Sequence, residues 1–309
     1  MKNESPEQWA VIINPKSGKR KFKRQCDYLF STLKDANINF EYRLTEFTGH
    51  AISITQEFIE KNYRNFLVVG GDGTFSEVVN GIFLSNKEDV SGFKLAIVPR
   101  GTGNDWGRFW GLTRNYEHSI EVFLKGNSQS IDIGKIEQAK EESHYFVNTI
   151  GLGLDAKIVD LTHRLKRYFG SHSFLYTLSL FIAAFSYRPY RLTISAEGIQ
   201  IEEKIFTVSI ANGCYTGGGL KQTPNALPYD GLFDVMIARK PSFWDIITAL
   251  SSLFKGKLLE HPIITSFQSP KIEIKGNEKV LLEADGIIIK NDAALRVSII
   301  HKAVQMIVP

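Results

Sequence analysis

The sequence predicts two consecutive domains, an α/β domain built on a parallel sheet and a β-rich, sandwich-like domain. The first 110 residues alternate short β-type runs with helical patterns, whereas strand-like runs dominate from about Ser130 onward. The chain has 309 residues, which is enough for two hydrophobic cores. We therefore place the domains at 1–130 and 131–299, and we leave open a return of the last strand, 300–309, to the first domain.

The first domain is predicted from apolar runs that end at turn residues. Four runs have the length and pattern of strands: Trp9–Ile13, Asn39–Leu44, Phe66–Val69 and Leu95–Val98. Apolar side chains at helical spacing fill the intervals between them, such as Phe22, Cys26, Leu29, Phe30 and Leu33 after the first run. Strands that alternate with helices indicate βα units and a parallel sheet.

The second domain is predicted from short β-type runs separated by turn residues. These runs are Ser130–Ile136, Tyr145–Ile150, Arg191–Ala196, Lys204–Ala211, Phe233–Ala238, Pro270–Ile274, Lys279–Glu283 and Leu295–Ile300. Two helices are expected among them, at 171–187 and 243–254. The apolar part of the first, Phe174 to Tyr187, is shorter than the roughly 20 residues that a membrane span needs. Many short strands favour a sandwich-like domain.

Polar, glycine-rich breaks follow the four predicted strands of the first domain. They are Asn14-Pro15-Lys16-Ser17-Gly18, Thr45-Glu46, Gly70-Gly71-Asp72-Gly73-Thr74 and Pro99-Arg100-Gly101-Thr102-Gly103-Asn104-Asp105. The carboxyl ends of parallel strands share one edge of a sheet, so these breaks are expected to meet in space. Glycines let backbone N–H groups approach phosphate oxygens, and helix N-termini add positive dipole ends. The four breaks therefore predict a phosphate site.

Two carboxylates stand in these loops, Asp72 and Asp105. Carboxylates beside phosphates are the usual protein ligands of Mg²⁺, either directly or through water. The alternative is that each glycine cluster is an ordinary turn and each Asp a helix cap. Four such loops at one sheet edge favour the ligand site. Another glycine pair, in Gly151-x-Gly153, imitates a dinucleotide fingerprint outside the alternating region, and we predict a turn that presents Asp155.

The residues resemble the diacylglycerol-kinase-like family of lipid kinases, including its relatives that act on sphingoid bases. The similar motifs in the first domain are Asn14-Pro15-x-Ser17-Gly18, Gly70-Gly71-Asp72-Gly73-Thr74, Glu77-Val78-Val79-Asn80-Gly81 and Pro99-x-Gly101-Thr102-Gly103-Asn104-Asp105. Those of the second are Phe146-Val147-Asn148, Gly151-x-Gly153-x-Asp155-Ala156, Gly217-Gly218-Gly219, Pro224-Asn225-Ala226, Asp230-Gly231-Leu232-Phe233-Asp234 and Gly256-Lys257 with His261-Pro262. A lone Gly-Gly-Asp-Gly-Thr is shared with NAD kinases, but the ordered set covers nearly the whole chain.

The resemblance implies a kinase that uses ATP and Mg²⁺. Its nucleotide-binding residues would be Asn14, Pro15, Lys16, Thr45, Gly70, Gly71, Gly73, Thr74, Gly101, Thr102 and Asn104. Asp72 and Asp105 would organise the catalytic Mg²⁺. Asp230 and the backbone carbonyl of Leu232 would hold a second, structural cation. The substrate would be a lipid hydroxyl, as in diacylglycerol, and the acceptor stays open among diacylglycerol, monoacylglycerol, phosphatidylglycerol, sphingoid bases and undecaprenol.

The chain departs from the family pattern at one position. The family usually ends a late strand with Asp-Gly-Glu, where the Glu is a candidate general base, but this chain has Asp285-Gly286-Ile287. Ile287 cannot accept a proton. The alternatives are that Asp72 is the base, that Glu283 or Asp285 replaces the Glu, or that catalysis is impaired. We favour an active enzyme with Asp72 as base, because phosphoryl transfer depends mainly on positioning and charge neutralisation.

Charge and cysteine content set the expected partners and compartment. The formal net charge of +4 fits anionic ligands or an anionic membrane surface and gives no argument for nucleic acid. Two distant cysteines indicate neither a disulfide framework nor a metal site, and a reducing compartment is expected. The N-terminus shows no apolar signal core. We expect a cytoplasmic protein that acts at the membrane periphery; the oligomeric state stays open and includes a homodimer.

Two segments have both a structural and a ligand-binding interpretation. The basic stretch Lys16–Arg24 is either a solvated helix face or a contact for nucleotide phosphates or lipid headgroups. The apolar helix at 174–187 is either core or part of an acyl-chain pocket or membrane-facing lid. The competing functions are an NAD kinase-like enzyme and a non-catalytic lipid or nucleotide binder, the latter motivated by Ile287.

Overall fold

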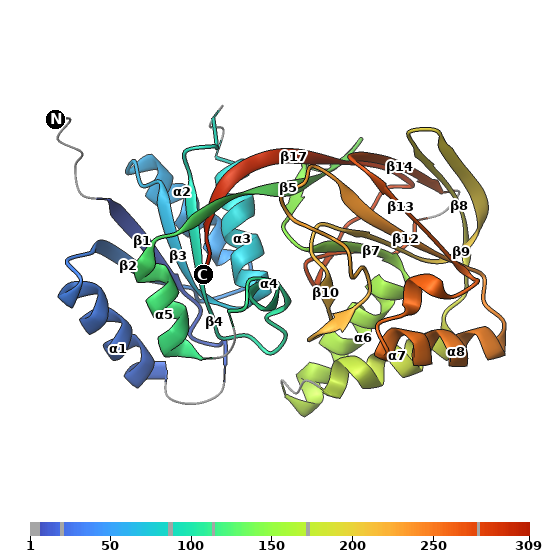
Figure 1. Cartoon of the computed structure of the whole chain (residues 1–309), viewed down its shortest axis with the longest axis horizontal. Helices are drawn as coiled ribbons and strands as arrows, with labels where there is room; N and C mark the ends of the chain where they lie inside the picture. The colour runs from blue at the N-terminus through green and yellow to red at the C-terminus, as the bar shows by residue number, and fades with distance from the viewer. Residues whose placement is uncertain (1–6, 19–21, 86–88, 113–114, 171–173, 277–278) are drawn as a thin grey trace. The chain divides into compact units, whose positions relative to one another are not determined.

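The computed structural model describes residues 7–18, 22–85, 89–112, 115–170, 174–276 and 279–309. The chain forms two compact units (Figure 1). The first comprises Met1–Ile131 and Lys302–Pro309, and the second comprises Asp132–His301.

The first unit alternates strands with helices. Its elements are β1 (Gln8–Ile13), α1 (Phe22–Asp35), β2 (Asn39–Leu44), α2 (His50–Glu60), β3 (Asn65–Gly70), α3 (Asp72–Phe83), β4 (Lys94–Pro99), α4 (Asp105–Phe109), α5 (Tyr116–Lys125), the start of β5 (Ser128–Gln138) and the end of β17 (Ala294–Ile307). The strands lie in the order β2-β1-β3-β4-β17, and these neighbours pair in parallel. This arrangement confirms the predicted α/β class.

Burial explains why the inner strands are continuous apolar runs. β1, β3 and β4 are buried along nearly their whole length, because helices cover both faces of a parallel sheet. β2 is an edge strand with mostly exposed or half-buried side chains. At the opposite side, Gln305 and Met306 of β17 pair in parallel with Lys94 and Leu95 of β4.

The second unit is rich in antiparallel strands. Its elements are the rest of β5, β6 (His144–Phe146), β7 (Thr149–Gly153), α6 (Leu154–Phe169), α7 (Phe174–Ser186), β8 (Tyr190–Ala196), β9 (Ile199–Ala211), β10 (Tyr215–Thr216), β11 (Leu220–Lys221), β12 (Phe233–Arg239), α8 (Phe243–Phe254), η1 (Leu258–Glu260), β13 (Ile264–Ser269), β14 (Lys271–Gly276), β15 (Leu282–Ala284), β16 (Ile287–Ile289) and the start of β17. Strand order is β16-β15-β7-β9-β8-β14-β17, and β12 pairs with both β9 and β13.

The core of the second unit lies between these strands. Ile210 of β9 pairs with Ile150 of β7 on one side and Val235 of β12 on the other. All three side chains belong to one buried cluster with Ile272 and Leu282. This β-rich core confirms the predicted sandwich-like class of the second domain.

One predicted strand is broken. The sequence pattern predicts a strand over Tyr145–Ile150, but β6 ends at Phe146 and β7 begins at Thr149. The interruption has a specific cause, because the Asp285 carboxylate accepts the backbone N–H groups of residues 147, 148 and 149. A side chain thus replaces the ladder that a continuous strand would need.

Two other local predictions were wrong. The predicted turn at Gly151-x-Gly153 is the end of β7, which leads directly into α6, a 16-residue helix that was not predicted. The predicted strand Lys279–Glu283 is shorter, since β15 covers only Leu282–Ala284. The strand β13 was also missed.

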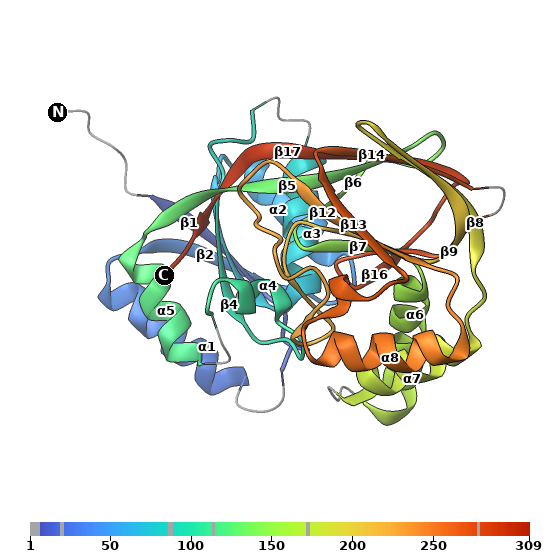
Figure 2. The ribbon, with the colours of Figure 1, turned by 45° about the vertical axis from the view of Figure 1, so that its right-hand side comes forward.

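Three helices gather on one side of the second unit, where α6, α7 and α8 lie together (Figure 2). α7 has a buried face that includes Leu175, Leu180 and Ala183, and an exposed apolar face that includes Phe181 and Phe185. No helix in the described ranges has the length and apolar character needed to cross a bilayer.

Candidate active site

The loops that follow β1 to β4 meet at one edge of the first unit's sheet. The backbone N–H of Thr45 donates to the carbonyl of Ile13 at 2.9 Å, and the N–H of Asn14 donates to the carbonyl of Val69 at the same distance. The N–H of Arg100 donates to the carbonyl of Gly70 at 2.6 Å. Each loop is thereby tied to the end of a neighbouring strand, as expected for a parallel sheet.

Glycines allow the third and fourth loops to touch. A Cβ atom added to Gly101 would lie 2.8 Å from the Cα of Gly71 and 2.7 Å from Oδ1 of Asn104. A Cβ on Gly71 would lie 3.0 Å from the Cα of Gly101. No larger residue fits at either position without moving backbone. Both glycines are therefore required for the close approach of the two loops.

The first loop is joined to the third through side chains. Asn14 donates from Nδ2 to Oγ1 of Thr74 at 3.0 Å, and its Oδ1 accepts the N–H of Lys16 at 3.0 Å. The Lys16 ammonium donates to the carbonyl of Glu46 in the second loop at 2.8 Å. Asn14, Lys16 and Thr74 thus lie in one hydrogen-bonded network that reaches Glu46 of the second loop.

Asp72 and Asp105 lie side by side at the same edge of the sheet. Oδ2 of Asp72 accepts the N–H of Asp105 at 3.0 Å, and Oδ1 accepts the N–H of Trp106 at 3.2 Å. Asp72 thereby caps the short helix α4, while it stands itself in the first turn of α3. Burial raises the pKa of Asp72 above its ordinary value, and the backbone N–H groups of Asp105 and Trp106 oppose that rise.

The two carboxylates converge in a way that fits a single magnesium ion. A Cβ on Gly103 would lie 3.4 Å from Oδ2 of Asp72 and 3.3 Å from Oδ2 of Asp105. Mg²⁺ is held in kinases by one or two carboxylates together with substrate phosphates and water. Two neighbouring carboxylates without a third protein ligand match that requirement. No cluster of three or more His, Cys, Asp or Glu side chains occurs in the described residues.

Glu77 supports the site from behind and was not predicted as a site residue. Its two carboxylate oxygens accept the N–H groups of Gly49 and Ala51 at 2.8 and 3.2 Å. A side chain of α3 thus caps the first turn of α2 and fixes the loop that carries Thr45. The sequence did offer a signal for this role, because Glu77 is an acidic residue about one turn into a helix that starts at the phosphate edge.

In the second unit, Asp285 is bound into the backbone. Its Oδ2 accepts the N–H of Val147 at 2.9 Å, and its Oδ1 accepts those of Asn148 and Thr149 at 2.9 and 3.2 Å. Asp285 and Gly286 form the turn between β15 and β16, with φ of 48° and 79°. Two successive positive φ angles match a tight hairpin turn, which Asp-Gly favours.

Glu283 and Ile287 lie on opposite faces of this hairpin. Glu283 pairs with Ile288, whereas Ile287 pairs with Ala284. Side chains alternate along a strand, and directly opposite residues share a face, so Glu283 points away from the side of Ile287. Burial raises the pKa of Glu283 well above its ordinary value, and the nearby Asp155 and Asp285 charges add to the rise.

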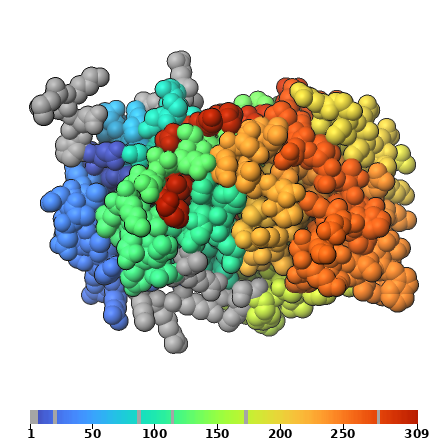
Figure 3. Space-filling view, viewed as in Figure 1, coloured from blue at the N-terminus to red at the C-terminus, as the bar shows by residue number. Residues whose placement is uncertain are grey.

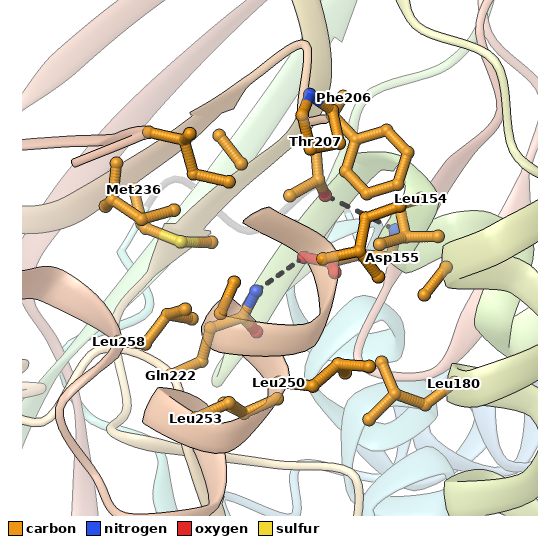
Figure 4. A pocket seen from close by; sticks show the side chains of 17 residues that line it. Leu154, Asp155, Leu180, Phe206, Thr207, Gln222, Met236, Leu250, Leu253 and Leu258 are labelled. Atoms are coloured by element: carbon orange, nitrogen blue, oxygen red, sulfur yellow. Dashed lines mark hydrogen bonds between the residues drawn. The ribbon is translucent and has the colours of Figure 1, made fainter. Parts of the chain in front are cut away.

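Asp155 stands at the polar end of an apolar pocket. It accepts a hydrogen bond from Nε2 of Gln222 at 2.9 Å, and its N–H donates to Oγ1 of Thr207 at 3.3 Å (Figure 4). Burial raises the pKa of Asp155 to about 6, against the hydrogen bonds from Gln222 and Thr207. Gln222 and Thr207 were missed because their positions, 67 and 52 residues from Asp155, give no pattern in the sequence.

The pocket encloses about 530 Å³ of space not filled by protein, including space open to solvent. Its walls come from α6, α7, α8, β9 and β12 and are mostly aliphatic (Figure 4). The apolar lining side chains include Leu154, Leu180, Phe206, Met236, Leu250 and Leu253. An apolar pocket with a few polar groups at one end suits an amphipathic ligand.

Asp230, the predicted ligand of a second cation, is exposed. Its Oδ1 accepts the N–H of Leu232 at 3.0 Å. Asp234 lies nearby, since the charge of Asp230 contributes to the raised pKa of Asp234, after burial as the larger cause. The second cation stays a prediction.

Comparison with known proteins identifies the class of this fold and site. The family model of the diacylglycerol kinase catalytic domain matches residues 8–136. The model of the YegS C-terminal NAD kinase beta sandwich-like domain matches residues 148–308. The chain belongs to the diacylglycerol kinase-like family of lipid kinases, and it is a lipid kinase.

Curated relatives agree with this assignment, and a solved structure agrees with the fold. A diacylglycerol kinase of Staphylococcus carnosus is 26% identical over 277 residues, which cover 89% of this chain and 87% of the relative. A diacylglycerol kinase of Bacillus subtilis is 28% identical over 281 residues, or 89% and 88% of the two chains. A crystal structure of a diacylglycerol kinase from Bacillus anthracis aligns over 98% of this chain and 97% of its own, with a TM-score of 0.72 and 20% identity. That structural likeness supports the fold.

Proposed function

We propose that this lipid kinase transfers the γ-phosphate of ATP, assisted by Mg²⁺, to a lipid hydroxyl such as that of diacylglycerol. The observation that carries the proposal is the convergence of Asp72 and Asp105 beside Gly103, at an edge made of glycine-rich loops. Glycine N–H groups suit phosphate oxygens, and a carboxylate pair suits the magnesium that accompanies them.

Asp72 is our candidate for the general base, and Asp105 for the second magnesium ligand. Asn14, Thr45 and Thr74, with the glycines of the third and fourth loops, would surround the nucleotide phosphates. When bound, Mg²⁺ would neutralise phosphate charge during transfer.

The hairpin residues are weaker candidates for the base. Asp285 accepts three backbone N–H groups, and this role holds its carboxylate in place. Glu283 points to the face opposite to Ile287. Neither residue therefore offers a carboxylate at the place that the family Glu would take, which favours Asp72.

The apolar pocket of the second unit supports a lipid as the acceptor. Its aliphatic walls would accommodate an acyl chain, and the Asp155–Gln222–Thr207 end would accept a polar group of the lipid. An NAD kinase-like reaction has no use for an aliphatic pocket of this kind.

An anionic membrane surface is the partner that we propose for the exposed aromatic face of α7 and α8. α8 has no buried residue, and its side chains form part of the orange surface in Figure 3. Trp244 is 72% exposed, and Phe185 packs on Phe243 with ring centroids 5.6 Å apart. Exposed lysines at positions 240 and 255 flank the helix. Aromatic side chains beside lysines suit the interface of an anionic bilayer, so we propose a cytoplasmic protein that binds membranes transiently.

The test is transfer of labelled γ-phosphate from ATP and Mg²⁺ to micellar lipids and to NAD. The lipid panel contains diacylglycerol, monoacylglycerol, phosphatidylglycerol, a sphingoid base and undecaprenol. Wild type is compared with Asp72→Asn and with Asp89→Asn. The control fits because Asp89 also accepts a backbone N–H, from Ser91 at 2.9 Å, but lies before β4, away from the phosphate edge.

We expect transfer to a lipid by wild type and Asp89→Asn, and a loss of about 100-fold or more in Asp72→Asn, since a positioned base contributes that much. Transfer to NAD alone would replace the proposal by the NAD kinase-like alternative. ATP binding without transfer to any acceptor would indicate a non-catalytic binder.

A further inference from the structure

The Arg100 side chain is a buried cation at the end of β4. Its exposed fraction is 8%, and Nη1 is enclosed without a hydrogen-bond partner. Among the described residues, the guanidinium makes neither a hydrogen bond nor an ion pair. Its carbon Cζ lies 5.1 Å from the centroid of the Phe22 ring, at the first residue of α1. Arg100 is not one of the residues that the family motif requires.

No ion pair joins this guanidinium to a carboxylate among the described residues. Cys26 and Tyr116 are two titratable groups that interact with it electrostatically. Burial raises the pKa of the Cys26 thiol and, strongly, that of the Tyr116 hydroxyl, so both stay neutral near pH 7. A buried charge without a counter-ion is unfavourable. The protein therefore retains a buried arginine that forms no ion pair with a described carboxylate.

The Nε–Nη2 edge of the guanidinium lies next to Gly18 of the first phosphate loop. A Cβ on Gly18 would lie 3.5 Å from Nε and 3.6 Å from Nη2 of Arg100, and 2.9 Å from its carbonyl oxygen. Gly18 has φ of 82°, which a residue with a side chain rarely adopts. Gly18 therefore lies beside the Nε–Nη2 edge of Arg100 with no side chain of its own between them. This is the edge through which an arginine binds a phosphate in a two-point contact.

Gly18 belongs to the loop that begins at Asn14, and Asn14 is hydrogen-bonded to Thr74 of the third loop. The N–H of Arg100 donates to Gly70 of the same third loop. The guanidinium is thus held among the loops that we assign to the nucleotide, next to the N-terminus of α1, where the helix dipole also favours an anion.

We propose that Arg100 binds a phosphate group of the nucleotide donor through Nε and Nη2, and that this phosphate is its missing counter-ion. The proposal rests on the proposed function, because it takes a nucleoside polyphosphate as the donor. It adds a phosphate-binding residue outside the glycine-rich motifs.

The experiment measures nucleotide affinity and the thermal stability of the ligand-free protein in Arg100→Met and Arg100→Lys. ATP, ADP, AMP and adenosine are titrated by calorimetry with Mg²⁺ and without lipid. Arg64→Met is the matched control, because Cζ of Arg64 also lies 5.1 Å from a phenylalanine ring, that of Phe93. Arg64 precedes β3 and so lies at the other end of the sheet.

We expect Arg100→Met to weaken ATP binding by about 10- to 100-fold, as for the loss of a charge-assisted two-point contact, and to leave adenosine binding unchanged. The ATP affinity of Arg100→Lys should lie between those of wild type and Arg100→Met, because lysine keeps the positive charge and loses the two-point guanidinium contact. The ligand-free melting temperature should stay the same or rise in Arg100→Met, because an uncompensated buried charge is removed. Arg64→Met should bind all four ligands like wild type.

ATP affinity within twofold of wild type in Arg100→Met would overturn the inference. A lower melting temperature with equal losses for ATP and adenosine would also overturn it, since it would indicate a packing role. Failure of wild type to bind ATP, ADP or AMP would do the same. Lipid phosphorylation is assayed separately. If ATP binding depends on Arg100 but wild type phosphorylates no lipid, the proposed function alone is rejected. If wild type phosphorylates lipid but ATP binding does not depend on Arg100, this inference alone is rejected.

Discussion

The change Asp285→Asn separates a structural role of this carboxylate from a catalytic one. In wild type, Oδ2 accepts the N–H of Val147 and Oδ1 accepts the N–H groups of Asn148 and Thr149, all of which are buried. An asparagine keeps one acceptor oxygen but places an NH₂ group against one of the three donors. One buried N–H then loses its partner, and the remaining bonds lose the contribution of the negative charge.

The magnitude follows from these contacts. An unsatisfied buried donor costs about 1–3 kcal/mol, and weakening two charge-assisted bonds adds about 1 kcal/mol, so the unfolding free energy should fall by roughly 2–4 kcal/mol. For a unit of this size, that loss corresponds to a decrease of about 5–15 °C in melting temperature.

The assay is calorimetric unfolding of wild type, Asp285→Asn and Asp292→Asn, followed by lipid phosphorylation well below both melting temperatures. Asp292 accepts one N–H, that of Lys140, at the surface at 3.1 Å, so its substitution should change stability by less than about 1 kcal/mol. We expect Asp285→Asn to phosphorylate lipid at a rate close to wild type. An unchanged melting temperature together with lost transfer would refute the structural role and restore Asp285 as a candidate base.

Three further predictions concern glycines, pH and the membrane. Gly81→Ala should destabilise the protein by about 1–3 kcal/mol, because its Cβ would lie 2.6 Å from Cβ of Thr55. Gly73→Ala should keep the melting temperature, because no atom lies within 4 Å of the added Cβ, and should lower ATP affinity. Burial raises the pKa of Asp155 to about 6. The stability that the neutral carboxyl contributes is therefore present below about pH 4 and lost as the pH rises through 6. The unfolding free energy of Asp155→Asn should rise by up to about 3 kcal/mol relative to that of wild type between pH 4 and 7. Trp244→Ser should weaken binding to anionic vesicles by about tenfold, since its ring is exposed on α8.

Each of these predictions has a control. Unfolding curves and ATP titrations of the two glycine variants test each other, and equal melting temperatures would contradict the close packing of α2 on α3. The pH series would contradict the raised pKa of Asp155 if wild type and Asp155→Asn kept a constant difference in stability. Phe47→Ser, in the other unit at 62% exposure, controls for a general loss of surface aromatics, and equal vesicle binding by wild type and Trp244→Ser would argue against the membrane surface.

The first unit followed closely from the sequence because its signals are local. Apolar runs bounded by turn residues gave β1, β3 and β4 within one residue at each end, and the parallel order then placed Asp72 and Asp105 at one edge. The contact between the two carboxylates could not be predicted, since it depends on the touching backbones of Gly71 and Gly101.

The second unit followed less well because its interactions join distant residues. The Asp285 carboxylate breaks a strand 136 to 138 residues away, and no local pattern marks such a contact. The helix α6 did carry a signal, with Asp155 in its first turn and Lys166 and Arg167 in its last. This helix was not predicted, because the glycines of Gly151-x-Gly153 were interpreted as a turn.

The return of β17 to the first unit links that unit's folding to the synthesis of the chain. β4 has one edge that is covered only when Gln305 and Met306 pair with Lys94 and Leu95, some 200 residues later in the chain. Ribosomes add about 5–20 residues per second, so this edge stays open for roughly 10–40 seconds after β4 is made. During that time an unpaired strand edge is available to chaperones or to other nascent chains. A ribosome that stops before β17 would release a first unit whose sheet ends at β4, in the order β2-β1-β3-β4. The unpaired edge of β4 would make such truncated products ready substrates for proteolysis.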